Sequence, residues 1–199
     1  MEKMFASVKN MRQKYREIFK SCFVECIDKI DKLQTDEEVS DFIDSYYREV
    51  CEKKVSLFEK RNSFKCSCCG DCCKLACSEF SPEELQQKAQ KGDNYANQFL
   101  SVFVPYDSNE DARSINPEYI ELLEKTGENE VYFYYCPKVT NDNKCSDYEN
   151  RPQICKDFPD NPLMLLPKNC GYVKWKEEVE DEALKFYALI EILSALRKK

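Results

Sequence analysis

The stretch that decides the fold is Cys66-Ser67-Cys68-Cys69-Gly70-Asp71-Cys72-Cys73, in which four of the cysteines follow the spacing CxxCxxCC. Two intervening residues let a loop turn two thiolates onto one cation, at sulfur–metal distances of about 2.3 Å for zinc. The repeated step CxxCxxC also holds iron–sulfur clusters in bacterial ferredoxins, with a remote cysteine before a proline as a further ligand. Cys136-Pro137 is a candidate for that remote ligand.

The whole chain of 199 residues contains thirteen cysteines and no histidine. An odd number of cysteines cannot all pair internally, and dense cysteines in a reducing compartment indicate metal binding or catalysis rather than disulfides. Cys72 and Cys73 are neighbours, about 3.8 Å apart at Cα, which is closer than disulfide geometry prefers. Without histidine, Ser–His and Cys–His catalytic pairs are excluded.

Charge and hydropathy restrict the partners and the compartment. The net charge of −7 disfavours nucleic acid, because phosphate binding needs a basic surface. Residues 1–20 are locally basic, and a basic helix can sit on nucleic acid or an anionic membrane, but a solvated helix face is the favoured interpretation. No apolar run approaches the roughly 20 residues of a membrane span, and residues 1–20 lack a signal-peptide pattern. We therefore predict a cytoplasmic protein.

Three long amphipathic helices are predicted around the cysteine-rich region. Apolar residues recur at spacings of three and four over 4–33, which is typical of a helix with one apolar seam. Thr35 and Glu38 form a capping box that starts a second helix running toward Asn62. A third helix is expected over 174–198. The first two should form an antiparallel hairpin, and the third should pack on it.

Shorter elements are predicted between these helices. Ser81-Pro82 starts a helix, with a cap followed by proline at the first helical position. Further helices are expected over 93–103 and 116–127. The segment 130–136 is rich in Val, Tyr and Phe and is the one convincing strand, with its aromatic side chains in the core.

The predicted fold class is therefore mainly α. An N-terminal helical hairpin and a C-terminal helix pack on an irregular cysteine-rich metal module with one or two short strands. The expected domains are 1–63 for the hairpin, 64–175 for the metal module and 176–199 for the C-terminal helix on the N-terminal helices. A single compact domain is the alternative.

Four separated elements of the sequence resemble the YkgJ-type cysteine-cluster family, a zinc- or iron-chelating domain. They are CxxCxxCC, the Cys-Pro step at 136–137, Cys145-Ser146-Asp147-Tyr148, and Arg151-Pro152-Gln153-Ile154-Cys155-Lys156-Asp157-Phe158-Pro159. The resemblance covers Phe64 to about Trp175, and the flanking helices lie outside it. Asp147 stands where the family usually has an apolar residue, and Lys156 where it usually has arginine.

The resemblance implies a set of eight metal ligands, which are Cys66, Cys69, Cys72, Cys73, Cys136, Cys145, Cys155 and Cys170. Eight thiolates suggest two four-cysteine sites, with adjacent Cys72 and Cys73 serving different ions, although one multinuclear site remains open. Cys68 and Cys77 are additional candidates that could equally be spare or buried thiols. Arg151 and Lys156 are expected to balance the thiolate charge from beside the ligands.

Three further cysteines lie on the predicted flanking helices. Cys22 and Cys26 fall on the apolar seam of the first helix, and Cys51 lies on the second. Free cysteine is among the most buried residue types, so we interpret all three as core thiols.

The predicted function is metal binding without chemistry of its own, as in a carrier, sensor or interaction module that meets a protein partner through its helices. The spacing favours an iron–sulfur cluster, with zinc as the close alternative. A second hypothesis is an enzyme or enzyme partner in redox or methyl transfer, since one relative of the family is a flagellin lysine N-methylase. A third is a structural zinc adaptor. No catalytic residue is predicted, because the chain lacks a GxGxxG loop and has only 4 glycines.

Overall fold

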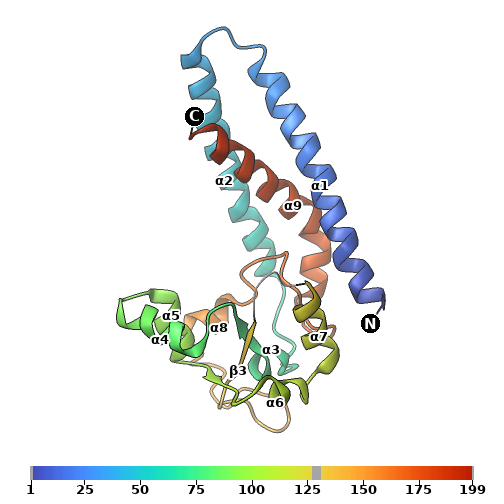
Figure 1. Cartoon of the computed structure of the whole chain (residues 1–199), viewed down its shortest axis with the longest axis vertical. Coiled ribbons are helices and arrows are strands. Elements are labelled where there is room, and N and C mark those ends of the chain that lie inside the picture. Colours follow the sequence, from blue (N-terminus) through green and yellow to red (C-terminus); the bar gives the residue numbers. More distant parts are fainter. Residues whose placement is uncertain (1, 127–130, 199) are drawn as a thin grey trace. The chain divides into compact units, whose positions relative to one another are not determined.

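The structure, a computed structural model, describes residues 2–126 and 131–198 and is mainly helical, with one small antiparallel sheet (Figure 1). In chain order the elements are α1 (Glu2–Ile30), α2 (Asp36–Arg61), α3 (Asp71–Lys74), β1 (Ala76–Ser78), α4 (Pro82–Gln90), α5 (Asn94–Leu100), β2 (Val104–Pro105), α6 (Asn109–Arg113), α7 (Pro117–Thr126), β3 (Tyr132–Tyr135), α8 (Gln153–Asp157) and α9 (Val173–Leu196). The mainly α fold class is confirmed. The sheet has three strands, where the sequence predicts one or two.

The chain divides into two compact units. The helical unit comprises residues 6–65 and 174–199 and contains most of α1, all of α2 and nearly all of α9. The cysteine unit comprises residues 1–5 and 66–173 and contains the sheet and the short helices. All of the predicted metal ligands lie in the cysteine unit.

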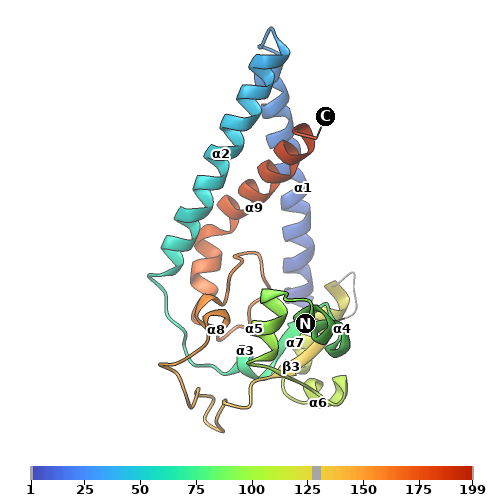
Figure 2. The ribbon, with the colours of Figure 1, turned by 90° about the vertical axis from the view of Figure 1, so that its left-hand side faces the viewer.

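The hairpin of the helical unit turns where the sequence predicts. The Thr35 hydroxyl accepts a hydrogen bond from the Glu38 amide at 3.2 Å, and the Glu38 carboxylate accepts one from the Thr35 amide at 3.2 Å. This capping box satisfies amides that the first turn of α2 leaves without partners. From that turn α2 runs back antiparallel to α1 (Figures 1 and 2).

Helix α9 joins this hairpin through both polar and apolar contacts. Tyr15 of α1 donates a hydrogen bond to Glu191 of α9 at 2.7 Å, and Lys60 of α2 pairs with Glu178 at 3.4 Å. The indole of Trp175 is fully buried and donates a hydrogen bond to the Leu57 carbonyl at 3.1 Å. Apolar side chains therefore form the interior of the helical unit, among them Cys26, Val50, Val179, Leu184 and Leu193.

The sheet of the cysteine unit has the order β1-β3-β2, with both pairs antiparallel. Because side chains alternate along a strand, β3 serves two cores. Phe133 packs in one buried cluster with Leu75 and Ile120. Tyr134 packs in another with Leu85 and Phe99. Both faces of this short strand are thus covered, as the aromatic run predicts.

Most predicted short elements occur within a few residues of their expected limits. Ser81 and Glu84 form a capping box at the start of α4, and Asp93 caps α5. Helix α5 ends at Leu100 rather than Phe103. The predicted boundaries at Gly127 and Glu130 lie outside the described residues. The sequence did not predict α3, α6, β1 or β2, since runs of two to five residues show little periodicity.

No helix within residues 2–126 and 131–198 combines the length and the apolar composition that crossing a membrane requires.

Shortening Trp175 to alanine should lower the free energy of unfolding by about 3–5 kcal/mol, because it empties a large buried volume. Trp175→Phe should cost less, since it keeps much of the packing and loses the bond to the Leu57 carbonyl. Urea unfolding followed by far-ultraviolet circular dichroism measures both changes. The exposed control Val55→Ala should shift stability by at most about 0.5 kcal/mol. A cost for Trp175→Ala no larger than that of the control would contradict the prediction.

Candidate metal centre

The segment from Cys66 to Cys73 folds as a tight loop that leads into the single turn of α3. Cys68 adopts φ 53, and Gly70, which precedes α3, adopts φ 80. The Cys68 amide donates a hydrogen bond to the Cys66 sulfur at 3.4 Å. The loop thereby brings the first two cysteines of the stretch together through the backbone.

Gly70 lies against Asn143 of a distant turn. A Cβ atom at Gly70 would stand 2.8 Å from the Asn143 Cβ atom, closer than real carbon contacts. The Lys74 ammonium donates a hydrogen bond to the Asn143 amide oxygen at 2.5 Å. Asn143 itself has φ 66, a conformation that asparagine tolerates better than most residues. Asn143 therefore fixes the loop, a role that sequence reasoning did not assign although the run Asn141-Asp142-Asn143 signals a turn.

The sheet register brings Cys73 and Cys136 together. Strand β1 pairs with β3 so that Ala76 lies opposite Tyr134. The two segments continue side by side beyond that pair. The Cys136 amide donates a hydrogen bond to the Cys73 carbonyl at 2.6 Å. Two cysteines far apart in the sequence are thus neighbours just beyond the paired ends of β1 and β3.

A small hairpin after β3 brings Cys145 back toward Cys136. Val139 and Cys145 form an isolated antiparallel bridge, and the Val139 amide donates to the Cys136 carbonyl at 3.1 Å. The Thr140 amide donates to the Lys144 carbonyl at 2.8 Å and closes the turn.

Cys155, on α8, belongs to the same neighbourhood. Burial raises the pKa of its thiol to about 11, and the nearby Cys136, Cys73 and Cys145 add to the rise while Arg151 opposes it. Burial also raises the pKa of Cys136, again with Cys73 and Cys145 as neighbours. Cys73, Cys136, Cys145 and Cys155 therefore form one cluster, which we call the Cys136 group.

Cys170 lies beside the other cysteines of the loop. The Ser67 hydroxyl donates a hydrogen bond to the Asn169 carbonyl at 2.8 Å, which ties the loop to the residue before Cys170. Burial raises the pKa of Cys170, and Cys69 and Cys66 raise it further. The structure thus brings Cys170 to the first part of the loop, and it brings Cys136, the remote partner that the sequence suggests for CxxCxxC, to Cys73.

Cys72 and Cys73 lie where the two clusters meet. The Cys72 thiol donates a hydrogen bond to the Cys73 sulfur, which raises the pKa of Cys72 well above its usual value and lowers that of Cys73 to about 7. Burial and the nearby Cys66 and Cys69 raise the pKa of Cys72 further. Cys66, Cys69, Cys72 and Cys170 therefore form a second cluster, the Cys66 group.

Arg151 is the cation that acts on several of these thiols. Its guanidinium lies 3.6 Å over the Tyr148 ring, and its Nε donates to the Tyr148 carbonyl at 3.0 Å, so the side chain is held in place. Its charge lowers the pKa of Cys73 and opposes the rise at Cys68 and Cys155. Lys156, the other predicted charge-balancing residue, is exposed on α8.

The remaining cysteines occupy different surroundings. Cys77 lies in β1 opposite Phe133 and packs against the apolar cluster around Ile120. Cys68 is partly buried beside Cys66. Cys22 and Cys26 are buried in the helical unit, as predicted for core thiols, and Cys51 is partly buried on α2.

All thirteen cysteines are free thiols. Within residues 2–126 and 131–198, no three cysteine, aspartate or glutamate side chains converge closely enough to hold one metal ion. The donor set nevertheless fits a thiophilic metal, since soft thiolates select zinc, Cu(I) and iron–sulfur clusters. The clusters thus bring suitable donors into proximity without a formed coordination sphere.

No family model, curated protein or solved structure matches the chain.

Substituting Gly70 by alanine should destabilise the cysteine unit by about 2–3 kcal/mol, from the left-handed backbone conformation together with the contact against Asn143. Gly92→Ala is the matched control, because Gly92 has φ 86 but open space around its Cβ position. It should cost only about 1 kcal/mol. Chemical denaturation measures both values. Adding Asn143→Gly to Gly70→Ala should recover part of the loss, and equal costs for the two single variants would contradict this account.

Proposed function

We propose that this chain is a metal-binding protein that uses the Cys66 group and the Cys136 group as two separate four-thiolate centres. The observation that carries the proposal is a set of backbone contacts that ties the segment of Cys170 to the loop at Ser67, and the segments of Cys136 and Cys145 to that of Cys73. Four ligands are the usual number for a structural zinc site and for an iron–sulfur cluster. The eight residues are also those that the resemblance to the YkgJ-type family implies.

Three contacts of the structure support the division into two groups. The Ser67 bond to Asn169 links the loop to Cys170. The Cys136 bond to Cys73 and the bridge at Cys145 link the residues of the other group. Each group thus draws ligands from segments that hydrogen bonds already hold together, which lowers the entropy lost when a metal orders them.

Arg151 supports the same proposal through charge. Four thiolates around a divalent ion leave a net charge of −2, so a centre of this kind is stabilised by nearby cations. The Tyr148 ring and carbonyl hold Arg151 beside Cys73, Cys68 and Cys155. When bound, zinc would fix the fold of the cysteine unit, and an iron–sulfur cluster would add one-electron chemistry.

For the metal itself we propose an iron–sulfur cluster at the Cys66 group, with zinc as the competing occupant. The residues Cys66, Cys69 and Cys72 with remote Cys170 follow the CxxCxxC pattern of cluster ligation. The Cys136 group has no CxxC pair, and its ligands come from four separate positions, which a single tetrahedral zinc ion also accepts.

Replacing one ligand of each group should remove the two centres separately. In purified protein, Cys69→Ser should abolish the centre of the Cys66 group and leave the other, and Cys136→Ser should do the reverse, because serine is a poor ligand for a soft metal. Elemental analysis and a sulfide assay of each purified variant measure how much metal and sulfide it retains. Cys51→Ser, on α2, is the control and should keep the full metal content. Loss of all metal in each single variant would indicate one multinuclear site, and metal-free wild-type protein would refute the proposed function.

Protein prepared without oxygen should be brown, with broad absorption near about 400 nm that bleaches on reduction or exposure to air, as thiolate-bound clusters do. Cys69→Ser should remove the band and Cys136→Ser should retain it. A colourless preparation that holds zinc and neither iron nor sulfide would decide for zinc at both groups.

A further inference from the structure

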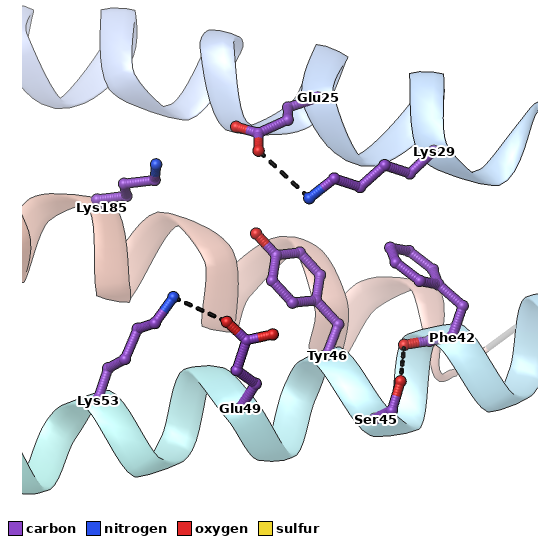
Figure 3. A pocket seen from close by; sticks show the side chains of 8 residues that line it. All are labelled: Glu25, Lys29, Phe42, Ser45, Tyr46, Glu49, Lys53 and Lys185. Atoms are coloured by element: carbon purple, nitrogen blue, oxygen red, sulfur yellow. Dashed lines mark hydrogen bonds and ion pairs between the residues drawn. The ribbon is translucent and has the colours of Figure 1, made fainter.

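The helical unit contains a cavity that the metal chemistry does not use. It is open to solvent, measures ≈ 400 Å³ and is lined by side chains from α1, α2 and α9 (Figure 3), of which Glu25, Ser45, Glu49, Lys53 and Lys185 are exposed. Cavities of about 300–1,000 Å³ with a few convergent polar groups are typical of small-molecule sites. This one lies between helices of a bundle, one of the places where such sites occur.

The charges around the cavity do not balance. Lys29 pairs with Glu25 at 3.3 Å, and Lys53 pairs with Glu49 at 3.0 Å. Lys185 of α9 also lines the cavity and forms no ion pair with any carboxylate that the structure describes. Three lysines face two glutamates, so the lining carries one positive charge.

The ionisable thiols and the phenol near the cavity do not supply a negative charge that would balance Lys185. Cys22 and Cys26 are buried beside it, and burial raises the pKa of both thiols, so they stay protonated near neutral pH. Tyr46 lines the cavity as well, and burial likewise raises the pKa of its phenol. The excess charge of Lys185 therefore remains for a ligand.

The cavity also offers an apolar wall and a neutral donor. The side chains of Phe42 and Tyr46 lie on its α2 side with ring centroids 5.5 Å apart. The Tyr46 hydroxyl points into the cavity (Figure 3) and has no hydrogen bond to another described residue. A phenol and an ammonium group that line the same cavity are suitable donors for one carboxylate or phosphate.

We propose that this cavity is a second binding site of the protein, which takes a small organic molecule with a single anionic headgroup. Lys185 and Tyr46 bind the headgroup, a carboxylate or a phosphate, and the ring of Phe42 covers the apolar part of the ligand, since the Lys29 ammonium already lies 4.6 Å from the centroid of the Tyr46 ring. The two existing ion pairs at the rim each lie within one helix, Lys29–Glu25 on α1 and Lys53–Glu49 on α2, and both remain intact.

Titration of the isotope-labelled full chain with benzoate and with phenyl phosphate, followed by nuclear magnetic resonance, tests this site. At least one of the two anions should bind saturably with a Kd of about 1 mM or below, and uncharged benzyl alcohol should bind at least tenfold more weakly. The tighter of the two anions identifies the headgroup. Absence of saturable binding by both anions, or equal binding of benzyl alcohol, would overturn the proposal.

Variants then locate the binding. Lys185→Gln should raise the Kd about tenfold, which is the usual effect of losing one charge-assisted hydrogen bond. Lys174→Gln, exposed on the same helix, is the matched control and should leave the Kd unchanged. Glu25→Gln should lower the Kd, because it removes a negative charge and frees Lys29. Equal effects of the two lysine variants, or weaker binding in Glu25→Gln with unchanged melting, would overturn the assignment.

Discussion

The arrangement of the cysteine unit depends on the register between β1 and β3, which the hydrogen bond from the Cys136 amide to the Cys73 carbonyl extends. Strands β1 and β2 are too short to hold a register by themselves, since isolated short strands are marginal in water. Burial of Phe133 and Tyr134 in clusters on opposite faces of β3 supplies the missing constraint. A slip of one residue would exchange those faces, so packing fixes the register and the register places Cys136 beside Cys73.

The two units present different kinds of ligand-binding group. In the cysteine unit, turns and short strands gather soft thiols, and Arg151 is the cation held among them. In the helical unit, three long helices leave a cavity whose excess charge belongs to Lys185, a hard ammonium group. The first arrangement suits a thiophilic metal and the second an oxygen anion. The two proposed ligands would therefore bind through separate residues.

The sequence predicted features that depend on residues close together in the chain. The capping boxes at Thr35 and Ser81 occur as expected, because each involves residues three positions apart. The long helices follow from apolar spacing in the same way. Strands β1 and β2 were not predicted, since a run of two or three residues has no measurable period and forms only because β3 lies between them.

The sequence by itself determined the kind of donor available to the cysteine unit, since thirteen cysteines without a histidine leave sulfur as the soft ligand of this chain. It also suggested that Cys72 and Cys73 serve different ions, with one multinuclear site left open, because adjacent side chains do not easily converge on one small ion. Only the tertiary structure decided which distant cysteines accompany each of them. Cys170 lies near Cys66 and Cys69, and Cys136 lies near Cys73, because long-range hydrogen bonds and strand register, which no local spacing encodes, bring those segments together.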